Sequence, residues 1–495
     1  MASPLQPQEI KNLGIYGVLR PAEIDDGLIP DEAVTEALNM HFDRRGAAIV
    51  RPGLIGVGST ITGTDVYPCV GLHNSQSSTL LAVFSGAGSS RIFWFDNGSW
   101  ITGLTAGTGS VRIRMVDFGS YTIILNMSYP GGSNTYGSMQ VFPVRAESTS
   151  YFATTHAYTN IQNMWGYVPS LGETYKSRVY VGGDPRYPSR LFFSSVISGT
   201  GRITWSPTAD FVDINPGDGE DMTGLKRFSL ELLVFKPNYI YRFKTSGVDP
   251  DPLIKIGTRS HESIVEGKRG LYFHHDTGIY RYSGGYPEEI SRAISDVINA
   301  IPFGQFDDIA GWRDSDHIYW SVGTLIIPEV KENVTWRNVV LRYTESSDIW
   351  TVYSYAREIR RGGPFISSTT SSLVIATDNG VVAEINRGVL DLGEPIRYRM
   401  RTKWYEWEGI ATRKLIEELV AICEKAQGMD LMYQIDENQE WHTIGQLKKM
   451  INFFINLSIR FHRIRFQITG VSRIESAVFK KLEIVKGINE GLIKE

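Results

Sequence analysis

The stretch LYFHHDTGIYRYSGG, residues 271–285, places His274, His275 and Asp276 between two runs of aromatic and β-branched residues. Such a trio is typical either of a metal or acid/base cluster or of the tip of a β-hairpin. Neighbouring residues on a strand point to opposite faces, so the two histidines cannot easily bind one metal ion without ligands from elsewhere. The choice depends on whether the same frame recurs along the chain.

The frame does recur, as an apolar run, a short polar turn and a second apolar or aromatic run. At residues 231–247, ELLVFKPNYIYRFKTSG has Lys-Pro-Asn at the turn, and at 371–388, SSLVIATDNGVVAEINRG has Asp-Asn-Gly, which accepts positive φ. Neither copy contains a histidine. We therefore interpret the His-His-Asp trio as variation at a surface turn. Further copies lie at 78–100, 121–144, 178–194 and 317–355.

Seven such hairpins start about 40 to 60 residues apart, which is the length of a β-propeller blade. The composition agrees, because 49 Gly and an aromatic share of 12% favour short strands and tight turns. The sequence predicts a mainly β protein, with a propeller-like repeat of hairpin blades over residues 61–390.

Beyond residue 390 the pattern changes to longer strands that alternate apolar and charged residues. We expect residues 391–495 to form a β-rich, sandwich-like domain, although RKLIEELVAICEK at 413–425 fits a helix equally well. Residues 1–60 are expected to form an extended segment that packs on the propeller or on a neighbouring subunit. SRAISDVINAI at 291–301 predicts a short amphipathic helix.

The bulk composition limits the function classes. Lys and Arg number 50 against 54 Asp and Glu, a formal charge of −4, so the chain lacks the basic excess of a nucleic-acid coat and any DNA contact is local. Cys69 and Cys423 are the only cysteines and fall in different predicted domains, which excludes a disulfide framework. We expect no membrane-spanning segment and no secretory signal.

Acidic clusters offer the candidate chemistry, and each has an ordinary structural explanation. In NPGDGEDMTG at 215–224, carboxylates suit a hard cation, but their spacing does not match an EF-hand and the same residues build turns. A propeller glycosidase needs a carboxylate pair at the channel, and no pair stands out. The acidic residues considered are Asp218, Glu220 and Asp221 for calcium, and Asp307, Asp308, Asp314 and Asp316 for glycoside hydrolysis.

Arginine-rich strands are the second candidate. In IRYRMRTK at 396–403 the arginines share one strand face, and IRFHRIRF at 459–466 is expected to bring its basic residues together on one strand. Such a face is either solvated or contacts an acidic partner or the DNA backbone. The residues are Arg397, Arg399 and Arg401 in the first stretch, and Arg460, His462 and Arg465 in the second.

No nucleophile, phosphate-loop, dinucleotide or zinc-protease motif is present. We therefore expect no enzyme activity, no catalytic, cofactor-binding or metal-binding residues, and no cofactor.

Two stretches carry a family resemblance. Residues 189–243 contain Phe-Ser-Ser, then Trp-Ser-Pro at 205–207, the loop DINPGDG at 213–219, LLVFKP and IYRF. Residues 19–54 contain Asn39, Asp43, Arg44, Gly46 and the Arg51-Pro52-Gly53 step. Together with the intervening hairpins they resemble the tail nozzle, or tail hub, proteins of short-tailed bacteriophages over about residues 14–390.

The resemblance implies a structural virion protein of the phage tail, assembled in the host cytoplasm. It implies a homohexameric ring below the portal and adaptor rings, which conducts genomic DNA without sequence-specific binding and docks a portal-adaptor ring protein and a tail fibre or tailspike. The alternative is a β-propeller that binds carbohydrate as an adhesin, or hydrolyses polysaccharide. For the adhesin, Trp94, Trp100 and Trp320 are candidates for stacking on sugar rings.

Overall fold

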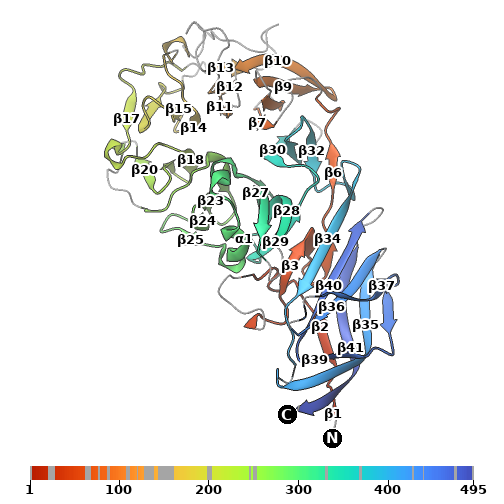
Figure 1. Ribbon diagram of the computed structural model, residues 1–495. Helices are drawn as coiled ribbons and strands as arrows, with labels where there is room; N and C mark the ends of the chain where they lie inside the picture. The colour runs from red at the N-terminus through yellow and green to blue at the C-terminus, as the bar shows by residue number, and fades with distance from the viewer. Residues whose placement is uncertain are drawn as a thin grey trace.

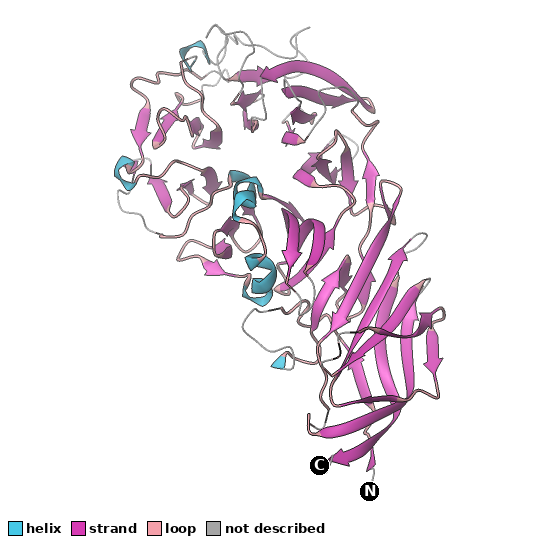
Figure 2. Cartoon of the chain, in the orientation of Figure 1, coloured by secondary structure: helices cyan, strands magenta, loops and turns pink. Residues whose placement is uncertain are grey.

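Strands dominate the computed structural model (Figure 2). It describes residues 3–20, 28–61, 68–75, 78–85, 90–107, 112–119, 121–126, 139–142, 161–164, 166–197, 203–244, 247–248, 254–328, 333–366, 371–407, 409–425, 428–436, 438, 440–472 and 477–492. The described residues form two bodies, a ring of small sheets and a block of long strands (Figure 1). The predicted fold class, a propeller followed by a sandwich-like domain, is confirmed.

The ring is a β-propeller, and the described residues form seven blades in it. Within each blade successive strands pair antiparallel, so a blade is a short meander. Blade 1 has β7 (Cys69–Asn74), β8 (Leu80–Ser85), β9 (Ser90–Asp96) and β10 (Ser99–Gly107). Blade 2 has β11 (Arg114–Phe118), β12 (Tyr121–Leu125) and β13 (Gln140–Phe142). Blade 3 has β14 (Leu171–Tyr175), β15 (Arg178–Gly182), β16 (Arg190–Phe193) and β17 (Phe211–Asp213).

The other blades repeat the pattern. Blade 4 has β18 (Gly224–Phe228), β19 (Glu231–Phe235), β20 (Ile240–Lys244) and β21 (Gly247–Val248). Blade 5 has β22 (Val265–Glu266), β23 (Leu271–His275), β24 (Gly278–Tyr282) and β25 (Glu288–Glu289). Blade 6 has β26 (Ala310–Asp314), β27 (His317–Ile327), β28 (Val334–Thr344) and β29 (Ile349–Ser354). Blade 7 has β30 (Ile359–Ile366), β31 (Ser371–Thr377), β32 (Val382–Ile385) and, from far upstream, β6 (Leu54–Gly56).

Strand β6 closes the ring. It pairs antiparallel with β32, with Leu54 opposite Ile385, so the last blade is completed by a strand from the N-terminal part of the chain. Since closure joins two segments that are far apart in sequence, it fixes the ring without leaving an open blade edge.

The second body is a β-sandwich with two sheets. One is built around β35 (Thr412–Glu424) and β41 (Val478–Leu492), with β38 (Ile451–Phe454) and β39 (Ile459–Phe461) pairing along β35. The other contains β34 (Glu394–Thr402), β40 (Ile464–Ser472), β36 (Met429–Ile435) and β37 (His442–Leu447). The ambiguous segment 413–425 forms strand β35, which pairs with β41 on one edge and with β38 and β39 on the other.

The N-terminal segment adds strands to both bodies. Strands β1 (Ser3–Pro4) and β2 (Gln8–Lys11) pair with β41. Strands β4 (Met40–Phe42) and β5 (Ala48–Val50) pair with each other, and β5 also pairs with β41. Strand β3 (Val34–Leu38) pairs with β34 and touches β29 of blade 6, and β33 (Leu390–Asp391) runs parallel to β6. Sandwich and propeller therefore share one continuous fourteen-stranded sheet.

Arg51 is buried at the junction of the two bodies. Its guanidinium forms a bidentate ion pair with Asp391 and donates to the carbonyl of Ser354 in blade 6 and to Asn39 Oδ1. The cation also lies 3.9 Å from the centroid of the Tyr355 ring. A Cβ at Gly53 would lie 2.0 Å from the Leu390 carbonyl oxygen, so the Arg-Pro-Gly step needs its glycine. The motif noted in the sequence thus builds the junction.

Helices are short. The segment 291–301 forms a 3-10 turn, η5 (Arg292–Ile294), followed by α1 (Ser295–Asn299), whose Val297 and Ile298 are buried. The other 3-10 turns among the described residues are η2 (Ile161–Met164), η3 (Pro216–Asp218), η4 (His261–Ser263) and η6 (Phe303–Asp308).

Candidate functional site

The first strand of each blade lines the propeller axis. Contacts join β7 to β11, β11 to β14 and β14 to β18, and further round they join β22 to β26, β26 to β30 and β30 to β7. The sequences of these strands are unusual for buried strands, since GLKRF of β18 and AGWRD of β26 carry glycine and charge. The axis is therefore polar.

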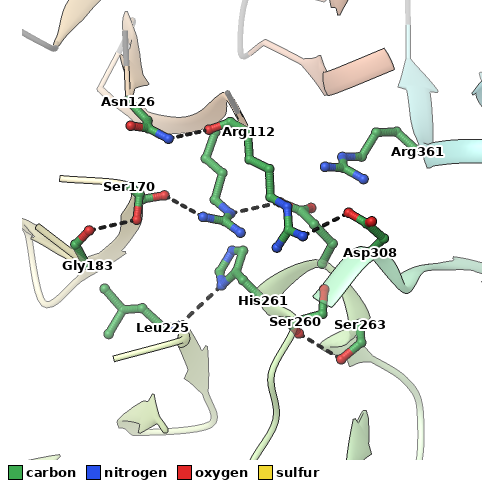
Figure 3. A network of polar contacts seen from close by, with 12 residues as sticks. Arg112, Asn126, Ser170, Gly183, Leu225, Ser260, His261, Ser263, Asp308 and Arg361 are labelled. Carbon is green, nitrogen blue, oxygen red and sulfur yellow. Dashed lines mark hydrogen bonds and ion pairs between the residues drawn. The ribbon is translucent and has the colours of Figure 1, made fainter. Parts of the chain in front are cut away.

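Ion pairs cross this axis. Arg114 on β11 of blade 2 contacts Glu262 on η4, which leads into blade 5, with Nε 2.8 Å from Oε1. The same guanidinium donates through Nη1 to the Ser170 carbonyl at 2.7 Å. At the edge of the cluster Arg112 reaches Asp308, which precedes blade 6, at 2.8 Å (Figure 3). Because blades 2 and 5 lie on opposite sides of the ring, these side chains span the channel.

Electrostatics fix the protonation of the cluster. Burial favours the neutral acid of Glu262, but the positive charges of Arg361 and Arg114 lower its pKa from 4.5 to about 2. Burial, aided by the charge of Arg114, lowers the pKa of His261 from 6.5 to about 3. At neutral pH the cluster therefore holds a carboxylate, charged arginines and a neutral imidazole.

The hydrogen bond to His261 identifies its tautomer. The backbone N–H of Leu225 donates to His261 Nδ1 at 3.3 Å. Because a neutral imidazole carries one proton, that proton is on Nε2, which is left as a donor. Figure 3 shows the ring between Leu225 and the arginines.

A cavity of about 140 Å³ lies among these side chains. Pockets for small organic ligands are typically about 300–1,000 Å³, so a sugar ring with its hydroxyl partners does not fit here. A few waters or a small ion do fit. The cavity is lined by Gly71, Leu72, His73, Ile113, Arg114, Met115, His261, Glu262 and Arg361.

The histidines of the opening stretch are structural. The hairpin is present as β23 and β24, but the expectation of a surface turn was wrong for the two histidines, which are both buried. His274 is 1% exposed and packs against the Phe306 ring, and His275 Nδ1 lies 3.1 Å from the Gly257 carbonyl oxygen. Only Asp276 remains at the turn, paired with Arg259. Packing of His274 against η6 and of His275 against the segment at Gly257 explains the difference.

The acidic loop at 215–224 is held by a lysine. Asp218 accepts from Lys236 Nζ at 2.7 and 2.8 Å and from the Tyr241 hydroxyl at 2.7 Å. Glu220 accepts from the backbone and side chain of Asn238. The loop therefore clamps the KPN turn of blade 4. Asp221 is exposed.

Three of the four aspartates near blade 6 have separate hydrogen-bond or ion-pair partners. Asp308 pairs with Arg112, Asp314 accepts from Asn386 at 3.0 Å, and Asp316 accepts from Lys268 at 3.2 Å. Asp307 is exposed. Across the described ranges, no group of three or more His, Cys, Asp or Glu is placed to hold a metal ion.

The predicted arginine face is bound within the chain. Arg399 and Arg401 on β34 both pair with Glu36 on β3, while Arg397 is exposed. The stretch 459–466 was predicted as one strand, which was wrong, because the chain breaks at His462 into β39 and β40. Arg460 and Arg465 are therefore in different sheets, and Arg465 lies over the rings of Trp404 and Trp441.

The tryptophans considered for sugar stacking are packed in the propeller. Trp320 is fully buried and Trp94 nearly so. The indole N–H of Trp100 donates to the Val57 carbonyl at 2.8 Å, and its ring contacts Phe95. These rings support the blades.

An apolar stripe lies on the sandwich. Strand β38 pairs with β35, and no other strand in the described part of the chain pairs with it. Ile451, Phe453 and Ile455 share one face by alternation, and their exposed fractions are 45%, 71% and 63%. Met450 precedes them at 66%. We call these four residues the β38 stripe.

The channel residues escaped the sequence interpretation. Arg114, Glu262 and Arg361 come from three blades, and nothing local links them. One sequence signal could have found them: charged residues occur in the short strands that begin each blade. A propeller places these strands around its axis.

Comparisons with known proteins find only distant structural likeness. No family model matches the chain, and no curated protein matches it. Among solved structures, the extracellular domain of a two-component system protein from B. thetaiotaomicron is 11% identical at a TM-score of 0.39, covering 79% of this chain and 44% of that one. The Pan2 WD40 domain of Neurospora crassa is 11% identical at 0.38, covering 68% and 95%. YCF48 from Cyanidioschyzon merolae is 10% identical at 0.38, covering 67% and 98%.

Because these TM-scores are all below 0.5, the propeller assignment rests on the strand pairing within this chain. The chain spans less than half of the B. thetaiotaomicron protein it matches. Among the described residues, none of the helices is both long and apolar enough to cross a membrane.

Proposed function

We propose that this chain is a structural subunit of a short-tailed bacteriophage tail, a nozzle or hub component that forms a homohexameric ring. In this role the ring conducts genomic DNA and docks a portal-adaptor ring protein and a tail fibre or tailspike. No catalysis is part of the proposal.

The observation that carries the proposal is the β38 stripe on a body whose two domains share one sheet. Monomeric proteins rarely leave clustered large apolar side chains exposed on a strand edge, because such an edge recruits other chains. The shared sheet and the buried Arg51–Asp391 pair hold the propeller in place relative to the sandwich. In an assembly, such a subunit would hold its contact surfaces in a defined relation to one another.

The resemblance to nozzle proteins supports the same role through architecture. Its N-terminal motif supplies Asn39 and Arg51 to the junction, and its central motif supplies the Asp218–Lys236 clamp of blade 4. Each of these groups stabilises the fold.

The carbohydrate-binding alternative is weaker. The channel cavity is too small for a sugar ring, and Trp94 and Trp320 are buried. The propeller channel is also crossed by side chains, so DNA in this proposal passes through the centre of the ring of subunits and not through a single propeller.

The test is electron microscopy of the purified chain and of phage particles from the source of the gene, with antibody labelling of this chain. A six-fold ring at the tail, labelled by the antibody, supports the proposal. Particles whose tails lack the chain refute it, and glycan-binding and hydrolysis assays then become the next measurements.

A further inference from the structure

Arg361 stands out in the channel because it is buried with few partners. It is 7% exposed, and its Nη1 donates to the neighbouring Arg360 carbonyl at 2.7 Å. Its Nε has no partner, and no carboxylate of the described residues lies within 4.0 Å of it. A buried guanidinium with five donors is costly unless an acceptor meets it.

The cavity beside Arg361 is positive. Among its lining residues, Arg114 and Arg361 contribute two positive charges and Glu262 one negative charge, which leaves +1 before the histidines are counted. Glu262 is ion-paired with Arg114 at 2.8 Å, and the charge of Arg361 also acts on it. One carboxylate therefore faces two guanidinium groups, and the Arg361 side chain extends toward the group drawn around Arg112 and His261 (Figure 3).

A second donor faces the same space. His261 lines the cavity, its Nδ1 accepts from Leu225, and its proton is therefore on Nε2, for which no acceptor is found in the described chain. The cavity thus combines two guanidinium groups and an imidazole N–H, with room for one small ion.

We propose that the cavity is a binding site for a small inorganic oxyanion of the phosphate or sulfate class, held by Arg361, Arg114 and His261. Guanidinium forks match the oxygen geometry of such anions, and charge-assisted bonds are the stronger ones. The bound anion neutralises the excess charge and joins blades 2, 5 and 7 at the axis.

This proposal does not depend on the proposed tail function, since it concerns only an anion bound in the cavity at the propeller axis. It is tested on the full chain by isothermal titration with inorganic phosphate and with sulfate, in a chloride buffer of matched ionic strength. We expect saturable binding at one site per chain.

Substitution identifies the site. Arg361→Gln removes at least one charge-assisted hydrogen bond to the anion, so we expect the dissociation constant to rise about 10- to 100-fold. Arg361→Lys keeps the charge and should lose less. The matched control is Arg360→Gln on the same strand, whose side chain pairs with Glu358 instead and should leave binding unchanged.

Three results overturn the proposal: no binding beyond the chloride control, equal binding by wild type and Arg361→Gln, or equal losses in Arg360→Gln and Arg361→Gln. If Arg361→Gln does not fold, Arg361→Lys and His261→Phe decide, because each leaves the blade sequence otherwise intact. A cryo-EM map in phosphate buffer with only water-sized density in the cavity also contradicts it.

Discussion

Arg51 and Asp391, 340 residues apart in the chain, form a fully buried bidentate ion pair where the propeller meets the sandwich. Each charge is compensated mainly by the other and by the surrounding polar groups. Breaking such a pair leaves an uncompensated buried charge, which costs far more than the pair itself contributes.

We therefore expect Arg51→Met to destabilise the protein by about 3–5 kcal/mol. The measurement is denaturant unfolding followed by tryptophan fluorescence. The double variant Arg51→Met/Asp391→Leu should recover much of the loss, because no charge then remains buried. The control is Arg387→Gln, an exposed residue of the same region, which should change stability by less than about 0.5 kcal/mol. A cost for Arg51→Met near that of the control would contradict the role of the pair.

The sequence predicted the middle strands of the blades and missed the inner ones. Strands β8, β19 and β23 are buried along nearly their whole length, so in the sequence they are apolar runs next to a turn. The first strands are short and face the polar channel, so GLKRF at β18 carries no strand-like alternation. Burial on both faces produced the visible pattern.

Elements whose partners lie far away in the sequence could not be predicted. Strand β6 has three residues, and only its partner β32 reveals it as the closing strand of blade 7. The polar cluster at the axis was missed for the same reason, since Arg114 and Glu262 are 148 residues apart. The two histidines at 274 and 275 were placed at a surface because the turn is local, whereas their contacts are distant in sequence. Phe306 of η6 packs on His274, and the Gly257 carbonyl meets His275.

The Asp218–Lys236 clamp predicts a pH dependence. Burial raises the pKa of Asp218, but hydrogen bonds from Lys236, the Glu220 backbone and Tyr241 outweigh it and lower the pKa below 3.8. A lowered folded-state pKa stabilises the protein above the unfolded value, and this contribution is lost as the pH falls through the folded value. Asp218→Asn should therefore lower the melting temperature by a constant amount from pH 5 to 8, with a difference that shrinks below about pH 4.

The size of the Asp218→Asn effect should reach about 3–5 kcal/mol at neutral pH, because Lys236 is left buried without its partner. Asp221→Asn is the matched control, since that carboxylate is exposed in the same loop. Thermal scans over the pH range measure both. A difference that persists undiminished at pH 3 would show that the loss is not due to the carboxylate charge.

Buried histidines predict a second, milder acid sensitivity. Burial lowers the pKa of His41, His261 and His274 from 6.5 to about 3. Between these values the unfolded chain takes up protons that the folded chain does not, so stability falls as the pH decreases below 6.5, by about 1.4 kcal/mol per pH unit for each fully titrating group.

We expect His274→Phe to reduce that slope by one proton. The ring already packs against Phe306, and its Nε2 has no hydrogen-bond partner, so the substitution removes a titrating group without opening a polar gap. Urea unfolding at pH 7, 6 and 5 gives the slope directly. An unaltered slope in His274→Phe would mean that this histidine is protonated in the folded state.

The β38 stripe predicts association between chains. Phe453→Lys places a charge in the centre of the stripe, at a side chain that is 71% exposed, so the fold should be unaffected while the contact is lost. Sedimentation velocity over a range of concentrations should show oligomers for wild type and a dissociation constant at least about tenfold weaker for the variant. Tyr286→Lys, at a 68% exposed position in the propeller, is the matched control. If both variants associate like wild type, β38 is not the contact, and the ring must be built through another surface.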